Sequence, residues 1–230
     1  KPTMTQPKAR RGRPPSLTRE QIAKTVLDVG FANLTFAAVR DRLGVGETTL
    51  YRYAPDRDEL VRMGLEYAYS GIEVPSFEGP WREVLTAHAL NTWHSLEKYP
   101  GAATEVARGI VPPIATYFFE ELCVILIKQG FSAKKAVLTC DMLLDMVIDS
   151  RRSVEHSDAF IAETGAGREE IQHQMQRTST DLQSFQDPGA SAERQEIRTI
   201  LRDSVTSDPL EWLRHKMTIL LDGIEYSLKS

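Results

Sequence analysis

The sequence has little cysteine and no long apolar segment. Only two of its 230 residues are cysteines. These residues, Cys123 and Cys140, have neither CxxC nor zinc-ligand spacing, which excludes disulfide-stapled and zinc-finger folds. Both lie in apolar helical patterns, so we expect core thiols in a reducing cytoplasm. The longest apolar run, residues 122–127, is far shorter than the roughly 18 residues of a membrane span. These absences predict a soluble, cytoplasmic protein with no membrane partner.

The sequence also lacks the short motifs of common enzyme classes. It contains no G-x-S-x-G, P-loop, G-x-G-x-x-G or H-E-x-x-H pattern. A di-iron helical bundle needs two Glu-x-x-His pairs on apolar helices, and only Glu170 and His173 have that spacing, in a polar stretch. We therefore expect a protein that is not an enzyme, with no catalytic residues, cofactor or metal site. A helical-bundle enzyme is the less favoured alternative.

Signals for β-structure are missing as well, because no segment alternates apolar and polar residues over the length of a strand. Apolar residues instead recur every three or four positions, which predicts an all-α fold. We expect a mobile loop over residues 153–190, where Gln, Ser, Thr, Glu and Gly predominate. The expected helices cover about residues 18–29, 35–43, 47–53, 56–68, 81–99, 113–129, 132–149, 191–204 and 209–228.

Charge is distributed unevenly along the chain. Residues 1–57 contain eleven Lys or Arg against five Asp or Glu, whereas the remainder contains 17 against 27. A basic N-terminal quarter favours a polyanionic partner, either nucleic acid or an anionic membrane. Residues 1–16 combine basic residues with four prolines and little apolar surface, which predicts a flexible basic arm.

Residues 17–57 have the pattern of a helix-turn-helix domain. Thr18 and Gln21 form a capping-box pair before the first helix, and Thr35 can cap the second. The glycines Gly44 and Gly46 interrupt the pattern before a third, short helix. A helix, a glycine-containing turn and a second helix are typical of DNA-binding domains that insert the second helix into the major groove.

The residues themselves resemble a known DNA-binding domain. Leu43-Gly44-Val45, Thr49-Leu50-Tyr51-Arg52-Tyr53, Arg57 and Leu60 together resemble the N-terminal domain of the TetR family of bacterial repressors. The resemblance implies a homodimer on a palindromic double-stranded DNA operator, with Tyr51 and Arg57 on phosphates. Arg52 is the candidate for a bidentate contact to guanine or for a phosphate contact. The alternative is a turn packed in a small helical core, in which Leu50 is buried on either view. The candidate DNA-binding set is Arg11, Arg13, Thr35, Glu47, Thr48, Thr49, Tyr51, Arg52, Tyr53 and Arg57.

Arg11 and Arg13 belong to that set for a separate reason. Arg11-Gly12-Arg13-Pro14 resembles the AT-hook core, in which an extended Arg-Gly-Arg segment enters a narrow minor groove. The alternative is a solvated tail.

Residues 58–230 resemble, more faintly, the ligand-binding and dimerisation domain of the tetracycline-repressor branch. The resemblance rests on residues 81–85, 128–132 and the closing helix over 212–228. In that branch the last two bundle helices pair with their mates. Apolar stripes support helix pairing, with ordinary core packing as the alternative. The stripes are Leu210, Leu213, Met217, Leu220, Ile224 and Leu228 in the closing helix, and Val137, Cys140, Leu144 and Val147 before it.

The same resemblance implies a pocket for a small-molecule inducer. Val106 stands where tetracycline repressors have a magnesium-ligating histidine, so we expect no tetracycline sensing. Asp141, Asp145 and Asp149 share one helix face, which indicates surface solvation rather than a metal site. A filled core without a ligand, and hence a ligand-independent DNA-binding protein, is the alternative. The candidate ligand-binding residues are His88, Thr92, Val106, Ile110, Phe119, Leu122, Val137, Cys140 and Asp141.

Overall fold

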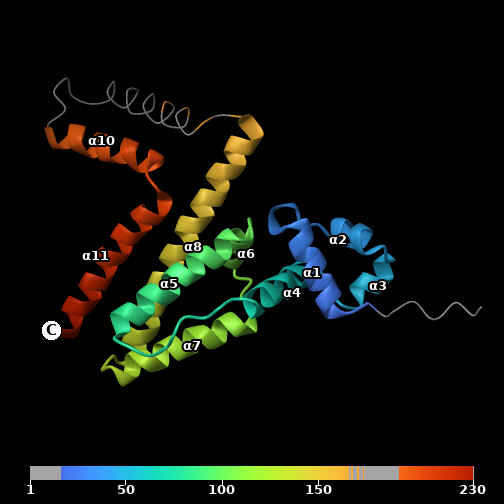
Figure 1. The fold of residues 1–230 in the computed structure, drawn as a ribbon, viewed down its shortest axis with the longest axis horizontal. Helices are drawn as coiled ribbons and strands as arrows, with labels where there is room; N and C mark the ends of the chain where they lie inside the picture. Colours follow the sequence, from blue (N-terminus) through green and yellow to red (C-terminus); the bar gives the residue numbers. More distant parts are fainter. Residues whose placement is uncertain (1–16, 166, 168–169, 171–172, 174–191, 230) are drawn as a thin grey trace, which may run out of the picture.

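The computed structural model describes residues 17–165, 167, 170, 173 and 192–229 (Figure 1). The expected basic arm, and most of the expected loop beyond Gly165, lie outside these residues. All regular secondary structure in the described part of the chain is helical, which confirms the predicted all-α fold class. The elements are α1 (Arg19–Val29), η1 (Phe31–Asn33), α2 (Phe36–Leu43), α3 (Glu47–Tyr51), α4 (Arg57–Ser70), α5 (Trp81–Glu97), α6 (Ala102–Ala107), α7 (Pro113–Lys128), α8 (Ala133–Thr164), α10 (Ala192–Thr206) and α11 (Pro209–Lys229).

Capping side chains define the N-terminal helices where the sequence predicts them. Thr18 and Gln21 accept hydrogen bonds from each other's amides, which completes the capping box of α1. The hydroxyl of Thr35 caps α2, and that helix ends at Gly44 with a left-handed φ of 64°. The carboxylate of Asp56 caps α4. The third helix ends two residues earlier than predicted.

The N-terminal domain shares its core with α6. Ile22, Val26 and Leu50 are fully buried in a cluster that also includes Ala102 and Ala103 of α6. Gly101 permits this close packing, because a Cβ there, at a φ of +90°, would lie 2.6 Å from the amide nitrogen of Ala32. The N-terminal domain is therefore packed directly on the C-terminal domain.

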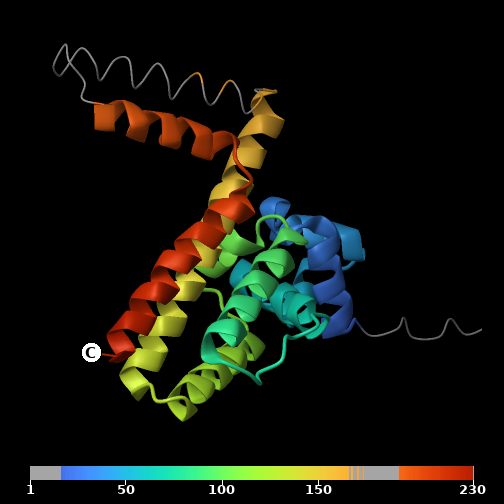
Figure 2. The same cartoon turned by 60° about the vertical axis from the view of Figure 1, so that its left-hand side comes forward.

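The C-terminal domain is a bundle of long helices. Helices α5, α7 and α11 each pack on α8, and their apolar faces form a second core (Figures 1 and 2). Cys123 of α7 and Cys140 of α8 are free, buried thiols in this core, as expected. The far end of α8 and α10 extend beyond the packed helices (Figure 2).

The prediction of a loop from residue 153 is wrong for its first part, because α8 continues to Thr164. Polar residues dominate this stretch, but the first helix-terminating residue is Gly165, with a φ of 67°. Contacts with neighbouring helices also stabilise it. Buried Arg151 donates a hydrogen bond to Glu97 at 3.1 Å and stacks over Trp93. One turn further, Glu155 accepts hydrogen bonds from the first turn of α6.

The apolar stripe of α11 packs mainly within its own chain. Leu213, Met217 and Ile224 are buried in the core with α8, so ordinary core packing accounts for these three positions. A different face of α11 carries exposed apolar side chains, Trp212, Ile219 and Tyr226, spaced seven residues apart. The apolar stripe predicted from the sequence is therefore the buried face of α11 and not its exposed apolar face.

Candidate DNA interface and ligand pocket

The helix-turn-helix presents the N-terminal half of α3 to solvent. Leu50 is fully buried and holds the helix on α1 and α2. Glu47, Thr48 and Arg52 are exposed, and Thr49 is half-buried beside them. The charged side chains of Glu47 and Arg52 and the hydroxyl of Thr48 are therefore accessible to base edges or phosphates.

Two tyrosines follow Leu50 and point in different directions. The side chain of Tyr51 is 47% exposed, and its ring stacks on Phe36 with centroids 4.4 Å apart. The hydroxyl of Tyr53 instead donates a hydrogen bond to the backbone carbonyl of Leu17. Only the hydroxyl of Tyr51 is therefore free for an outside partner among these two.

Arg57 and Thr35 have intramolecular roles. The guanidinium of Arg57 donates from Nε to the Leu34 carbonyl at 2.9 Å and from both Nη atoms to the carboxylate of Glu105, at 2.5 and 3.2 Å. In the single chain all three nitrogens therefore have protein acceptors, and the expected phosphate contact of Arg57 stays a prediction. The Thr35 hydroxyl accepts from the Ala38 amide at 3.0 Å. Arg11 and Arg13 lie outside the described residues.

Glu105 connects the two domains. This residue lies on α6 and is only 4% exposed. Its carboxylate also accepts a hydrogen bond from Arg108 at 2.6 Å. Arg108 in turn reaches Asp58 of α4 at 3.5 Å. Burial of a carboxylate requires such pairing, since an uncompensated buried charge is strongly destabilising. Any movement of α6 must therefore move or break contacts at the start of α4.

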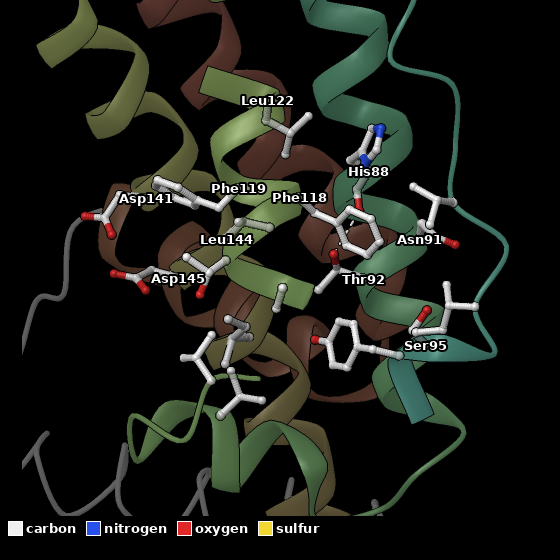
Figure 3. A pocket seen from close by; sticks show the side chains of 18 residues that line it. His88, Asn91, Thr92, Ser95, Phe118, Phe119, Leu122, Asp141, Leu144 and Asp145 are labelled. Atoms are coloured by element: carbon white, nitrogen blue, oxygen red, sulfur yellow. Dashed lines mark hydrogen bonds between the residues drawn. The ribbon is translucent and has the colours of Figure 1, made fainter. Parts of the chain in front are cut away.

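A cavity of about 340 Å³ lies between α4, α5, α6, α7 and α8 (Figure 3). Six of the nine predicted ligand-binding residues line it, on four of these helices: His88, Thr92, Val106, Phe119, Leu122 and Asp141. The cavity contradicts the alternative of a filled core.

Three predicted pocket residues do not line the cavity. Ile110 is buried in the core of the N-terminal domain. Val137 is 46% exposed and lies one turn short of the cavity on α8. Cys140 is fully buried because it points to Cys123 of α7. The resemblance therefore predicts the correct helix, α8, but not the face of it that lines the cavity. The lining residues of α8 are Asp141, Leu144, Asp145 and Ile148.

Other lining residues were missed by sequence reasoning. Asn91 and Ser95 lie on the His88 face of α5 at helical spacing, and that spacing is the signal by which they could have been found. Tyr69 of α4 and Phe118 of α7 also line the cavity. No sequence pattern indicates them, because their position depends on how the helices pack.

Burial controls the ionisation of two pocket residues. His88 is 6% exposed, its Nε2 lies 3.3 Å from the Ser76 carbonyl, and burial lowers its pKa below the ordinary value. Burial also raises the pKa of Tyr69 to about 12. Both side chains are therefore neutral near pH 7. Within the described residues there is no group of three or more potential metal ligands.

No helix in the described part of the chain has the length and apolar character needed to span a membrane. This agrees with the absence of long apolar runs in the sequence.

Comparison with known proteins identifies the N-terminal domain. Residues 20–62 match the model of the "Bacterial regulatory proteins, tetR family". The chain is 26% identical over 162 residues to the HTH-type transcriptional repressor DrrR1 of Streptomyces coeruleorubidus, a match that covers 67% of the chain and 60% of that relative.

Solved structures share the fold over nearly the whole chain. Streptomyces coelicolor ActR in complex with actinorhodin superposes with a TM-score of 0.73 at 17% identity, covering 93% of this chain and 99% of ActR. TetR from Acinetobacter baumannii gives a TM-score of 0.64 at 19% identity, covering 93% of this chain and 100% of that one. The N-terminal domain therefore matches the tetR family of bacterial regulatory proteins, and the whole chain shares the fold of these solved structures.

Proposed function

We propose that the chain is a transcriptional repressor that binds a palindromic operator as a homodimer and is released by a small molecule in the cavity. The main support for this proposal is the series of contacts that joins the cavity to the recognition helix. Val106 lines the cavity, and the adjacent Glu105 holds Arg57 at the first residue of α4. Helix α4 follows α3 directly, so the cavity and the recognition helix are joined by a few contacts.

The DNA side of the proposal rests on the exposed residues of α3. Tyr51 supplies a phosphate contact, and Arg52 supplies a contact to guanine or to a phosphate. In a two-fold dimer, the two recognition helices enter major grooves about 34 Å apart or a small multiple of that. The basic arm adds sequence-independent attraction to phosphates.

The release mechanism requires a ligand that distinguishes two conformations. Moving the dimer from 1:99 to 99:1 takes about 5.5 kcal/mol of differential binding. A ligand that displaces α6 would alter the buried contacts of Glu105, and with them the orientation of α4. The names of the related proteins, a repressor and a regulator solved with a bound small molecule, support this function.

Dimerisation is proposed through the exposed apolar side chains of α8 and α11. Leu138 and Met142 on α8, and Ile219 and Tyr226 on α11, are each at least 44% exposed. Exposed apolar groups gathered on neighbouring helices are typical of protein interfaces. The interface holds two recognition helices at a fixed separation.

The experiment uses an operator selected from random DNA and a compound found by thermal-shift screening. In the wild-type protein, the compound should weaken operator binding at least about tenfold, measured by fluorescence anisotropy. In Glu105→Gln, compound affinity should stay within about threefold of wild type while the release is reduced, because the charge that links α6 to Arg57 is lost. Arg19→Ala, which removes an exposed ion pair with Glu59, is the control. A cavity-binding compound that leaves wild-type operator affinity unchanged contradicts the proposal.

A further inference from the structure

The cavity carries formal charge of one sign only. Asp141 and Asp145 of α8 line it, and the lining includes no lysine or arginine. Figure 3 shows both carboxylates on the α8 side, pointing away from His88 and Thr92 of α5, and both residues are exposed. Within the described residues, neither carboxylate has an ion-pair partner. One turn further along α8, Asp149 pairs with Arg152. Asp141 and Asp145 therefore lie exposed at the edge of the cavity, and no cation of the described residues pairs with them.

The opposite wall contains polar groups without partners. Ser95 of α5 is 6% exposed and lines the cavity, and no described residue hydrogen-bonds its hydroxyl. The same holds for the side-chain amide of Asn91 and the phenol of Tyr69. Asn91 and Tyr69 are half-buried, and among the described residues only the Nε atom of Arg151 is a fully buried polar side-chain atom without a partner, so the polar atoms of this wall remain accessible from the cavity. These groups are therefore available to a ligand.

Two other polar residues of this wall are already engaged. The hydroxyl of Thr92 donates to the His88 carbonyl at 2.9 Å, and the His88 ring lies against the Ser76 carbonyl. Thr92 and His88 therefore form part of the wall, but these side-chain hydrogen-bonding atoms already have partners in the protein. The polar groups without partners thus lie on α4, on α5 and, at Thr116, on α7, whereas the carboxylates lie on α8.

Apolar side chains occupy the space between these two polar sides. Phe118, Phe119 and Leu122 of α7 lie between α5 and α8 in Figure 3. Leu144 and Ile148 of α8 continue this surface. Aromatic and aliphatic walls favour a flat apolar body, and aromatic faces also attract cations.

We propose that the cavity binds an amphiphilic cation with a flat aromatic body. A protonated amine lies at Asp141 and Asp145, and a hydrogen-bonding oxygen or amide at the other end meets Ser95, Asn91 and Tyr69. This inference rests on the proposed function, because it defines the chemical class of the ligand for the same site. The pocket should therefore bind a cationic ligand more tightly than a neutral ligand with the same apolar area.

The test compares two probes with the same ring system, 9-aminoacridine, which is a cation at neutral pH, and acridine, which is neutral. Binding to the full chain is measured by calorimetry without DNA, because acridines intercalate. We expect 9-aminoacridine to bind at least about tenfold more tightly than acridine. In the double variant Asp141→Asn and Asp145→Asn, affinity for 9-aminoacridine should fall about tenfold or more, while affinity for acridine should stay within about threefold.

Two further variants make the result specific. Asp149→Asn removes the same charge from the same helix outside the cavity, and should leave both affinities unchanged. Ala115→Trp fills the cavity from α7 and should abolish binding of both probes, with circular dichroism as the folding control. Equal affinity for the two probes, an equal loss in Asp149→Asn, or binding that survives Ala115→Trp overturns the inference.

Operator binding is measured separately with the ligand-free double variant. If operator binding is intact but the cavity does not prefer the cationic probe, only the proposed ligand class is wrong. Absence of sequence-specific DNA binding overturns the proposed function instead.

Discussion

At the scale of single residues, Tyr51 and Tyr53 provide a matched test of the DNA interface. The hydroxyl of Tyr51 faces solvent, whereas that of Tyr53 is used inside the domain. Tyr51→Phe keeps the ring that stacks on Phe36, so it should leave the free energy of unfolding unchanged within about 0.5 kcal/mol. It should weaken DNA binding about three- to tenfold for specific and scrambled duplexes alike, because a phosphate contact is lost.

Tyr53→Phe is the control for this prediction. It should lower the free energy of unfolding by about 1 kcal/mol, because the hydrogen bond to Leu17 is lost, and should affect DNA binding less. Chemical denaturation and fluorescence anisotropy measure the two effects. Identical DNA affinities for Tyr51→Phe and the wild type would remove Tyr51 from the interface.

His88 should make stability depend on pH. Its pKa is lowered in the folded protein by burial, so the unfolded chain binds more protons in the interval below the ordinary histidine pKa of about 6.5. The stabilising contribution is therefore complete above that value and is lost as pH falls towards the lowered pKa. We expect the free energy of unfolding of His88→Gln to decline less than that of the wild type between about pH 7 and pH 5.

His94→Gln is the control, because His94 lies on the same helix but its side chain is 52% exposed. A difference between His88→Gln and the wild type that stays constant over this pH interval would show that His88 does not titrate with folding. Denaturation at a series of pH values measures it.

Residue-scale features of the DNA-binding domain were largely predictable from the sequence. The caps at Thr18, Thr35 and Asp56 depend on neighbours within three residues, so the local pattern determines them. The ion pair of Arg57 with Glu105 joins residues 48 positions apart. Such a pair depends on tertiary packing, and no local pattern indicates it.

At the scale of elements, α8 shows where composition misleads. Polar residues over 153–164 resemble a loop, yet none of them terminates a helix before Gly165. Arg151 and Glu155 are polar residues whose partners lie on α5 and α6. Side chains that look like solvated surface in the sequence therefore make the contacts that hold the helix in place.

The role of Glu155 at α6 can be measured. Its carboxylate accepts from the amides of Ala103 and Thr104, at 3.3 and 3.4 Å, in the first turn of α6. Glu155→Ala leaves those donors without this partner and should lower the free energy of unfolding by about 1 kcal/mol. Glu163→Ala, an exposed position on the same helix, should have little effect. Equal stability of the two variants in urea denaturation would contradict the capping role.

At the scale of the whole molecule, the exposed apolar face of α11 should hold two copies together. Ile219 is 76% exposed in the single chain. Ile219→Glu introduces a charge into the proposed interface and should shift the protein towards the monomer in analytical ultracentrifugation, with loss of operator binding. Ile127→Glu adds the same charge at a 45% exposed position of α7, and should leave the dimer intact. A dimer that persists in Ile219→Glu at micromolar concentration would show that this face is not the interface.

Sequence-specific DNA recognition by a two-fold dimer can be tested with one binding measurement. The full chain is titrated into a labelled operator duplex, selected from random DNA, and into a scrambled duplex of the same composition at moderate salt. We expect the protein to bind the operator at least about 10³-fold more tightly than the scrambled duplex, with two protomers per operator. Equal affinity for the two duplexes would show that the protein does not recognise a specific DNA sequence.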